Sequence, residues 1–139
     1  CVIVKNNRQI STGYNGTPSG IKNCFDGGCE RCLQRKYGDI RSGELLERCL
    51  CTHAEANAIM QCAIFGIGVT PNGSTLYSTY SPCLECSKMV ISVGVSRVVA
   101  LSSYPEDGVE ILRQANIQTS TIAADKISSW LSRMNIVKK

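Results

Sequence analysis

A histidine, a glutamate and two cysteines are the residues of this sequence whose types and spacing could do chemistry. They stand in two short motifs, His53-x-Glu55 and Pro82-Cys83-x-x-Cys86. One imidazole and two thiolates give Zn²⁺ three protein ligands, and its fourth position takes a water whose pKa the ion lowers toward neutrality. A carboxylate two residues from the histidine can take the proton of that water and pass it on. The motifs therefore predict a hydrolytic zinc site with His53, Cys83 and Cys86 as ligands and Glu55 as general acid and base.

The two motifs are specific only in combination. A Cys-x-x-Cys pair alone more often marks a structural zinc site or a redox pair, and a histidine and a glutamate at a helix start often only cap the helix. Here each motif precedes a predicted helix, whose N-terminus favours thiolate over thiol at Cys83 and Cys86. His53 is also the only histidine of the chain, so any histidine-ligated site must use it.

The elements that must position these motifs alternate between strands and helices. The first two strands form a hairpin that turns at Asn6-Asn7. The whole order predicts one α/β domain over residues 1–139, with helices on both faces of a mixed five-stranded sheet. Periodicity and turn residues predict strands at 2–5, 9–14, 74–79, 97–101 and 117–122 and helices at 54–65, 84–93, 109–115 and 125–134.

Five of the nine cysteines lie in one segment, a Cys-rich insert at about residues 21–52. The odd total and the short spacings argue against a disulfide framework and favour metal ligation in a reducing cytosol. No regular element is predicted across residues 21–51, and a structureless stretch of this length needs something to organise it. We therefore predict a second, structural Zn²⁺ held by four of the five, with reduced free thiols as the alternative. Cys29 and Cys32 are expected to form one chelating pair, and Cys49 and Cys51 could form another. The candidates are Cys24, Cys29, Cys32, Cys49 and Cys51, whereas Cys1 and Cys62 are expected to fill the core.

Composition predicts a soluble globular domain. Hydrophobic residues make up 43% and charged residues 19%, no apolar run approaches the roughly 20 residues of a membrane span, and no signal peptide is visible. The net charge of +4 is too small and dispersed to indicate duplex nucleic acid as a stable partner. The chain begins directly in a strand, from which we expect a preceding N-terminal segment in the whole protein. Basic residues of the insert are expected to be solvated, with phosphate binding left open: Arg31, Arg35, Lys36, Arg41 and Arg48.

The paired motifs match a known signature, H-x-E followed by P-C-x-x-C, of the zinc-dependent cytidine deaminase superfamily. The loop Gly13-Tyr14-Asn15-Gly16-Thr17-Pro18-Ser19-Gly20 and the helix start His53-Ala54-Glu55-Ala56-Asn57-Ala58-Ile59 resemble those of the deoxycytidylate (dCMP) deaminases within it. The Cys-rich insert resembles a zinc-stabilised insert of fungal and viral-type members. The resemblance covers nearly all the chain up to Tyr104 and implies a three-layer α/β/α cytidine deaminase-like fold.

The resemblance implies hydrolysis of dCMP to dUMP and ammonia, which supplies dUMP for thymidylate synthesis. Glu55 would protonate the pyrimidine N3 and then the leaving amine. The remaining substrate contacts that it implies are Asn15 to the sugar, the backbone N–H of Ala54 to the base carbonyl, the carbonyl of Ser81 to the exocyclic amine, and Tyr104 for stacking or phosphate contact. Without the other motifs, Asn15 would be taken as a turn asparagine and Tyr104 as an exposed loop tyrosine.

The resemblance also implies regulation and assembly. Such enzymes are commonly cytoplasmic homohexamers that dCTP activates, accompanied by Mg²⁺, and that dTTP inhibits. Tyr14, Asn15 and Gly16 are the residues implied for the effector site. Three alternatives stay open: a deaminase of dCTP, deoxycytidine or cytosine in nucleic acid; a non-catalytic zinc-binding module; and an inactive deaminase fold kept for assembly, against which the intact motifs argue.

Overall fold

The centre of the molecule is a mixed sheet of five strands in the order β2-β1-β3-β4-β5. The structure is a computed structural model and describes residues 1–41, 43–65, 70–104 and 108–134. β1 pairs antiparallel with both β2 and β3, whereas β3–β4 and β4–β5 are parallel. The predicted α/β class and mixed five-stranded sheet are confirmed. The strands are β1 (Val2–Lys5), β2 (Arg8–Thr12), β3 (Thr75–Tyr80), β4 (Arg97–Ser102) and β5 (Gln118–Thr121).

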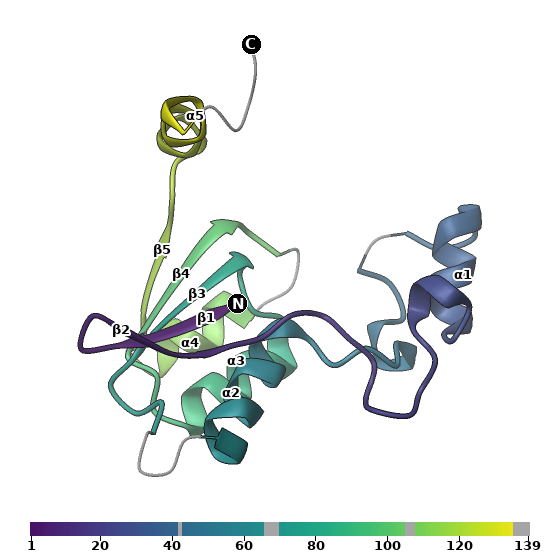
Figure 1. Cartoon of the computed structure of the whole chain (residues 1–139), viewed down its shortest axis with the longest axis horizontal. Coiled ribbons are helices and arrows are strands. Elements are labelled where there is room, and N and C mark those ends of the chain that lie inside the picture. Colours follow the sequence, from purple (N-terminus) through teal and green to yellow (C-terminus); the bar gives the residue numbers. More distant parts are fainter. Residues whose placement is uncertain (42, 66–69, 105–107, 135–139) are drawn as a thin grey trace.

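Three helices pack together on one face of this sheet (Figure 1). They are α2 (Ala54–Phe65), α3 (Leu84–Ser92) and α4 (Gly108–Gln114). Parallel strands joined in order by right-handed crossovers must place their connecting helices on the same side, which accounts for α3 and α4. The last helix, α5 (Ala124–Arg133), stands apart beyond β5 and buries none of its residues. Among the described residues, helices therefore cover one face of the sheet, and the expected second helical layer is not packed on it.

The interior between sheet and helices is apolar. Ile3, Leu76, Val90 and Leu112 are fully buried there, and Cys62 belongs to the same cluster, with Cys1 packed against it as expected. The hairpin turns at Asn6 and Asn7, whose φ angles of 51° and 59° are those of a two-residue type I′ turn. No helix in the described part of the chain is long and apolar enough to cross a lipid bilayer.

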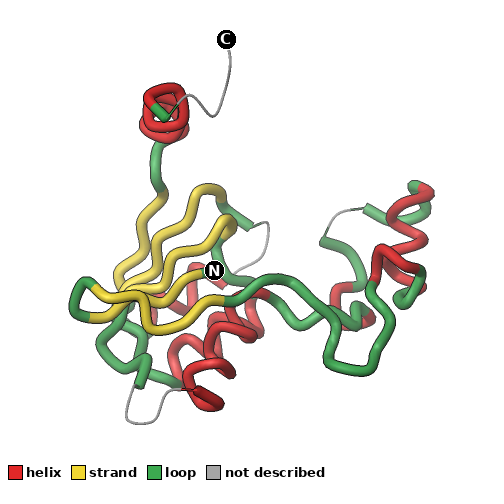
Figure 2. Tube along the Cα trace, in the orientation of Figure 1, coloured by secondary structure: helices red, strands yellow, loops and turns green. Residues whose placement is uncertain are grey.

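The Cys-rich segment forms a lobe that projects to one side of the sheet, and it is more ordered than its sequence suggested (Figure 2). The expectation of an irregular stretch was wrong, because the lobe contains α1 (Glu30–Tyr37) and short 3₁₀ turns at Cys24–Asp26 and Leu46–Arg48. α1 begins with an acidic first turn and ends at Gly38, whose left-handed φ of 87° lets its N–H close the last turn. Both the start and the stop signal of α1 stand in the sequence.

One basic residue of the lobe is not solvated. Arg31, on α1, is only 5% exposed, and its Nε and Nη2 both donate to the backbone carbonyl of Glu44, at 2.9 and 2.7 Å. The expectation of a solvated side chain was therefore wrong at this position. Arg31 instead ties α1 to the segment that returns toward the sheet.

Gly13 lies against the first turns of α2, where there is no room for a side chain. A Cβ at this position would clash with the backbone carbonyl oxygen of Ala54 and the backbone nitrogen of Ala58. Because backbone cannot move aside as a side chain does, we expect Gly13→Ala to lower the free energy of unfolding by about 1–3 kcal/mol or more. Gly16→Ala is the control, since its Cβ would approach only the exposed ring of Tyr14 at 3.3 Å. Thermal denaturation of both variants checks this; equal melting temperatures would contradict it.

Candidate functional site

The predicted metal ligands meet where β3 ends and two helices begin. His53 directly precedes α2, Cys83 is the N-cap of α3, and Cys86 lies in its first turn. In open sheets with parallel strands, sites form outside the carboxyl ends of the strands. The neighbouring parallel strand, β4, brings Tyr104 to the same edge.

The three ligand atoms converge. His53 Nδ1 lies 3.3 Å from Cys83 Sγ and 3.6 Å from Cys86 Sγ. Atoms held about 2.0–2.3 Å from zinc at tetrahedral angles lie roughly 3.3–3.8 Å from one another. The spacing and the donor set of one imidazole nitrogen and two sulfurs therefore fit Zn²⁺ with one position left for a small molecule.

The two thiols of this group share a proton unequally. A hydrogen bond from the thiol of Cys86 lowers the pKa of Cys83 to about 4, and the contact with His53 acts in the same direction. The same hydrogen bond raises the pKa of Cys86, and burial and the nearby charges of Cys83 and Glu55 raise it further. The group thus offers one thiolate and one thiol, and a bound metal ion must displace the remaining proton.

Glu55 is buried beside this group and is held by a serine. It is 7% exposed, and its Oε1 accepts a hydrogen bond of 2.5 Å from the hydroxyl of Ser78 on β3. Its charge acts on Cys86, so the carboxylate lies within electrostatic reach of the ligand group. Sequence reasoning missed Ser78. The signal that could have found it is a serine two residues after Leu76, on the strand face that turns toward the core.

The loop with Asn15 is joined to the start of α2. Asn15 Oδ1 accepts from the backbone N–H of Ala54 at 2.8 Å, so the two residues expected to bind substrate are bonded to each other. Gly16 and Thr52 exchange two backbone hydrogen bonds, and Asn57 Nδ2 donates to the carbonyl of Tyr14 at 2.8 Å. The implied effector residues therefore lie on a loop held directly against the segment that carries His53.

Ser81 and Tyr104 are also brought together. The backbone N–H of Tyr104 donates to Ser81 Oγ at 2.6 Å, and the backbone N–H of Ser81 donates to the carbonyl of Ser102 at 2.8 Å. Tyr104 packs against the cluster that contains Cys83 and Cys86, and its ring meets that of Tyr80 edge-on, with centroids 6.4 Å apart. The ring of Tyr104 thus lies beside the ligand group.

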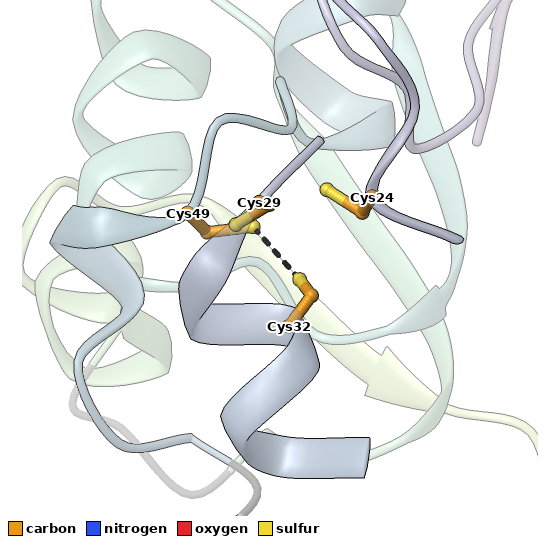
Figure 3. Close-up of side chains that lie close together, drawn as sticks. All are labelled: Cys24, Cys29, Cys32 and Cys49. Carbon is orange, nitrogen blue, oxygen red and sulfur yellow. Dashed lines mark hydrogen bonds between the residues drawn. The ribbon is translucent and has the colours of Figure 1, made fainter. Parts of the chain in front are cut away.

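A second group of thiols lies in the projecting lobe. The sulfur atoms of Cys24, Cys29, Cys32 and Cys49 all lie within 4.8 Å of one another, and Figure 3 shows them gathered at the start of α1. Cys32 Sγ and Cys49 Sγ are 3.7 Å apart, the spacing of two sulfurs on one zinc ion. Four cysteines around one point are the donor set of a closed, structural zinc site.

Cys51, the fifth candidate of the lobe, lies outside this group of four sulfur atoms. Its Sγ lies 2.9 Å from that of Cys24, too close for both atoms to ligate the same zinc ion. Burial raises the pKa of both thiols. Burial also acts to raise the pKa of Cys29, but hydrogen bonds from the backbone N–H groups of Leu50 and Cys32 outweigh it and lower that pKa to about 7. The geometry thus favours the set without Cys51.

Comparison with known proteins agrees with this site. The family model of the cytidine and deoxycytidylate deaminase zinc-binding region matches residues 1–102. Deoxycytidylate deaminase of Saccharomyces cerevisiae is 44% identical over 119 residues, which cover 84% of this chain and 35% of the yeast protein. Deoxycytidylate deaminase of Mycobacterium phage D29 is 38% identical over 112 residues, which cover 76% of each.

A solved structure gives the same result. The dCMP deaminase of cyanophage S-TIM5, in complex with dCMP and dUMP, superposes with a TM-score of 0.65 at 31% identity, covering 87% of this chain and 78% of that one. The chain spans about a third of the length of the yeast relative, 35%. Both motifs lie within the matched residues, and the match takes in more than half of the chain. The protein belongs to the cytidine and deoxycytidylate deaminase zinc-binding family.

Proposed function

We propose that residues 1–139 form a single dCMP deaminase domain, with the Cys-rich lobe as an insert, that converts dCMP and water into dUMP and ammonia. The observation that carries the proposal is the convergence of His53 Nδ1, Cys83 Sγ and Cys86 Sγ beside the buried carboxylate of Glu55. It is supported by relatives described as deoxycytidylate deaminases and by the structural likeness to a cyanophage enzyme in complex with dCMP and dUMP.

In the proposed reaction, three residues hold the metal ion and one transfers the protons. His53, Cys83 and Cys86 would hold a zinc ion, which would lower the pKa of the water that attacks C4 of the pyrimidine. Glu55 would take a proton from the attacking water and give it to N3 of the ring. It would then take the second proton from the new C4 hydroxyl, as the C4 carbonyl forms and the C4–N bond breaks, and pass it to the departing amine. Burial of Glu55 keeps solvent from competing for these protons.

Substrate contacts follow from the residues around the ligand group. The backbone N–H of Ala54 would donate to the base carbonyl and Asn15 would bind the sugar, so the substrate must replace the hydrogen bond that joins them. The carbonyl of Ser81 would accept from the exocyclic amine. Tyr104, packed against the ligand group, would border the base.

The test is a substrate panel on the purified, zinc-loaded protein. We expect loss of cytosine absorbance with dCMP and slower turnover of dCTP, deoxycytidine and a cytosine-containing oligonucleotide. Turnover of another member of the panel in preference to dCMP would keep the deaminase and replace the substrate. Zinc binding without turnover of any member would instead favour the zinc-binding module or the inactive fold.

We also propose a structural Zn²⁺ in the lobe, bound by Cys24, Cys29, Cys32 and Cys49. Because a structural zinc site contributes directly to folding, Cys32→Ser should release one equivalent of zinc and expose the lobe to proteolysis. Cys51→Ser is the matched control and should retain the zinc, since Cys51 lies outside the four-sulfur group. Zinc content by mass spectrometry under native conditions decides. Zinc loss from Cys51→Ser, with Cys32→Ser unaffected, would contradict the assignment.

We propose a cytoplasmic homohexamer that supplies dUMP for thymidylate synthesis, is activated by dCTP with Mg²⁺ and is inhibited by dTTP. The loop of Tyr14, Asn15 and Gly16 supports an effector role, because its hydrogen bonds reach Ala54, Thr52 and Asn57 at the start of α2. A ligand that moved this loop would move the segment that carries His53. Rates of dCMP turnover with and without dCTP or dTTP test this coupling.

A further inference from the structure

The hydroxyl of Ser78 is the unassigned group in direct contact with the catalytic carboxylate. Ser78 is 8% exposed and Glu55 is 7% exposed, and the hydroxyl donates to Glu55 Oε1 at 2.5 Å. The contact joins β3 to the first turn of α2, 23 residues apart in the chain. Nothing in the two zinc motifs predicts it.

The register of the sheet makes this serine unusual. Ser78 stands opposite Ala100 on β4, and two residues earlier Leu76 stands opposite Val98. The three neighbours are buried apolar residues that face the helical layer. A hydroxyl at such a position costs free energy unless it is hydrogen-bonded, and here Glu55 provides the acceptor.

We infer that Ser78 is a positioning residue for Glu55, an inference that rests on the proposed function. A glutamate side chain has three rotatable bonds, and a carboxylate that accepts and donates protons several times in one turnover must return to the same place. The bond from Ser78 engages Oε1 and fixes the rotamer, so that Oε2 is the oxygen available to the substrate. Ser78 itself does not touch the substrate.

The kinetic test separates positioning from binding. Ser78→Ala should lower kcat for dCMP about 10–100-fold, as loss of a supporting hydrogen bond at a metal site typically does. KM should change by less than about threefold, because the substrate contacts are untouched. Ser78→Thr keeps the hydroxyl on a residue that suits a strand, and it should return kcat to within about threefold of the original.

A spectroscopic readout needs no turnover. The side-chain carboxyl ¹³C resonance of Glu55, identified by its loss in Glu55→Gln, should move in Ser78→Ala because the carboxylate loses a donor. It should stay near its original position in Ser78→Thr. The resonance therefore reports the contact even if the substrate assignment fails.

Ser74→Ala is the matched control. Ser74 directly precedes β3, is 1% exposed, and its Oγ has no hydrogen-bond partner in the described part of the chain. Its variant should keep both kcat and the Glu55 resonance.

The inference is overturned if folded Ser78→Ala keeps full kcat or an unmoved resonance, or if Ser78→Thr is as slow as Ser78→Ala. Absence of dCMP turnover in the unmodified protein would overturn the proposed function instead, and the resonance alone would then decide the role of Ser78. If Ser78→Ala does not fold, Ser78→Cys takes its place, because a thiol is a weak donor. Its kcat should be lower than that of Ser78→Thr, and equal kcat values would overturn the inference.

Discussion

Replacing Glu55 by glutamine should lower kcat for dCMP by roughly 10³–10⁴-fold, at the upper end of what one general acid–base group contributes. The reason is that the proposal gives this one side chain every proton transfer of the reaction. Glutamine has nearly the same shape and still accepts the hydrogen bond from Ser78, but it cannot take a proton from water or protonate the leaving amine. Steady-state kinetics with dCMP measure the loss, and zinc content should be unchanged because Glu55 is not among the three converging ligands.

The control for Glu55→Gln is Glu85→Gln, the same change in the second zinc motif. The side chain of Glu85 is 72% exposed and pairs with Lys88 at the surface, so this variant should retain the original kcat. A Glu55→Gln protein that keeps its zinc and deaminates dCMP at the original rate would show that another group moves the protons. Parallel loss of activity in both variants would indicate a general effect of removing charge.

Most of the fold could be predicted because its signals are local. The Asn6-Asn7 turn, the apolar strands and the helices after each zinc motif all depend on residues within a few positions of one another. α1 was missed although its signals are equally local, because most of its eight residues are polar or charged. The lobe is ordered instead by contacts such as that of Arg31 with Glu44.

The metal ligands could be predicted for a related reason. His53, Cys83 and Cys86 stand in motifs whose spacing is itself the constraint, since ligands on one helix start must approach one ion together. The partners of Glu55 and Ala54 obey no such spacing. Ser78 and Asn15 reach them across 23 and 39 residues, and only the register of β3 and the course of the loop bring them there.

The choice of four cysteines among the five of the lobe depends on the fold for the same physical reason. The spacing allowed Cys49 and Cys51 to form a second chelating pair beside Cys29 and Cys32, and the structure does not group them so. In the structure, Cys49 lies with the other three, whereas Cys51 lies outside this group with its Sγ 2.9 Å from that of Cys24.

Removing one ligand of the catalytic group is the second large effect that we expect. Cys86→Ser should abolish zinc binding at this site and lower dCMP turnover at least roughly 10³-fold, because the remaining imidazole and thiolate hold the ion too weakly and no activated water is supplied. Zinc content should fall from two equivalents per chain to one, since the four thiols of the lobe are untouched. Native mass spectrometry gives the metal count and the dCMP assay gives the rate.

A buried cysteine outside both groups provides the control for Cys86→Ser. Cys62, on α2, is 3% exposed and packs in the apolar core between the sheet and the helices. Cys62→Ala should therefore lower the free energy of unfolding by about 1 kcal/mol but keep both zinc ions and the rate of dCMP turnover. If Cys86→Ser kept two zinc ions and full turnover, the assignment of the catalytic ligands would be wrong. If it lost one ion yet deaminated dCMP normally, the catalytic role of that ion would be wrong while its binding site stood. The two readouts thus separate binding of the metal from its use in catalysis.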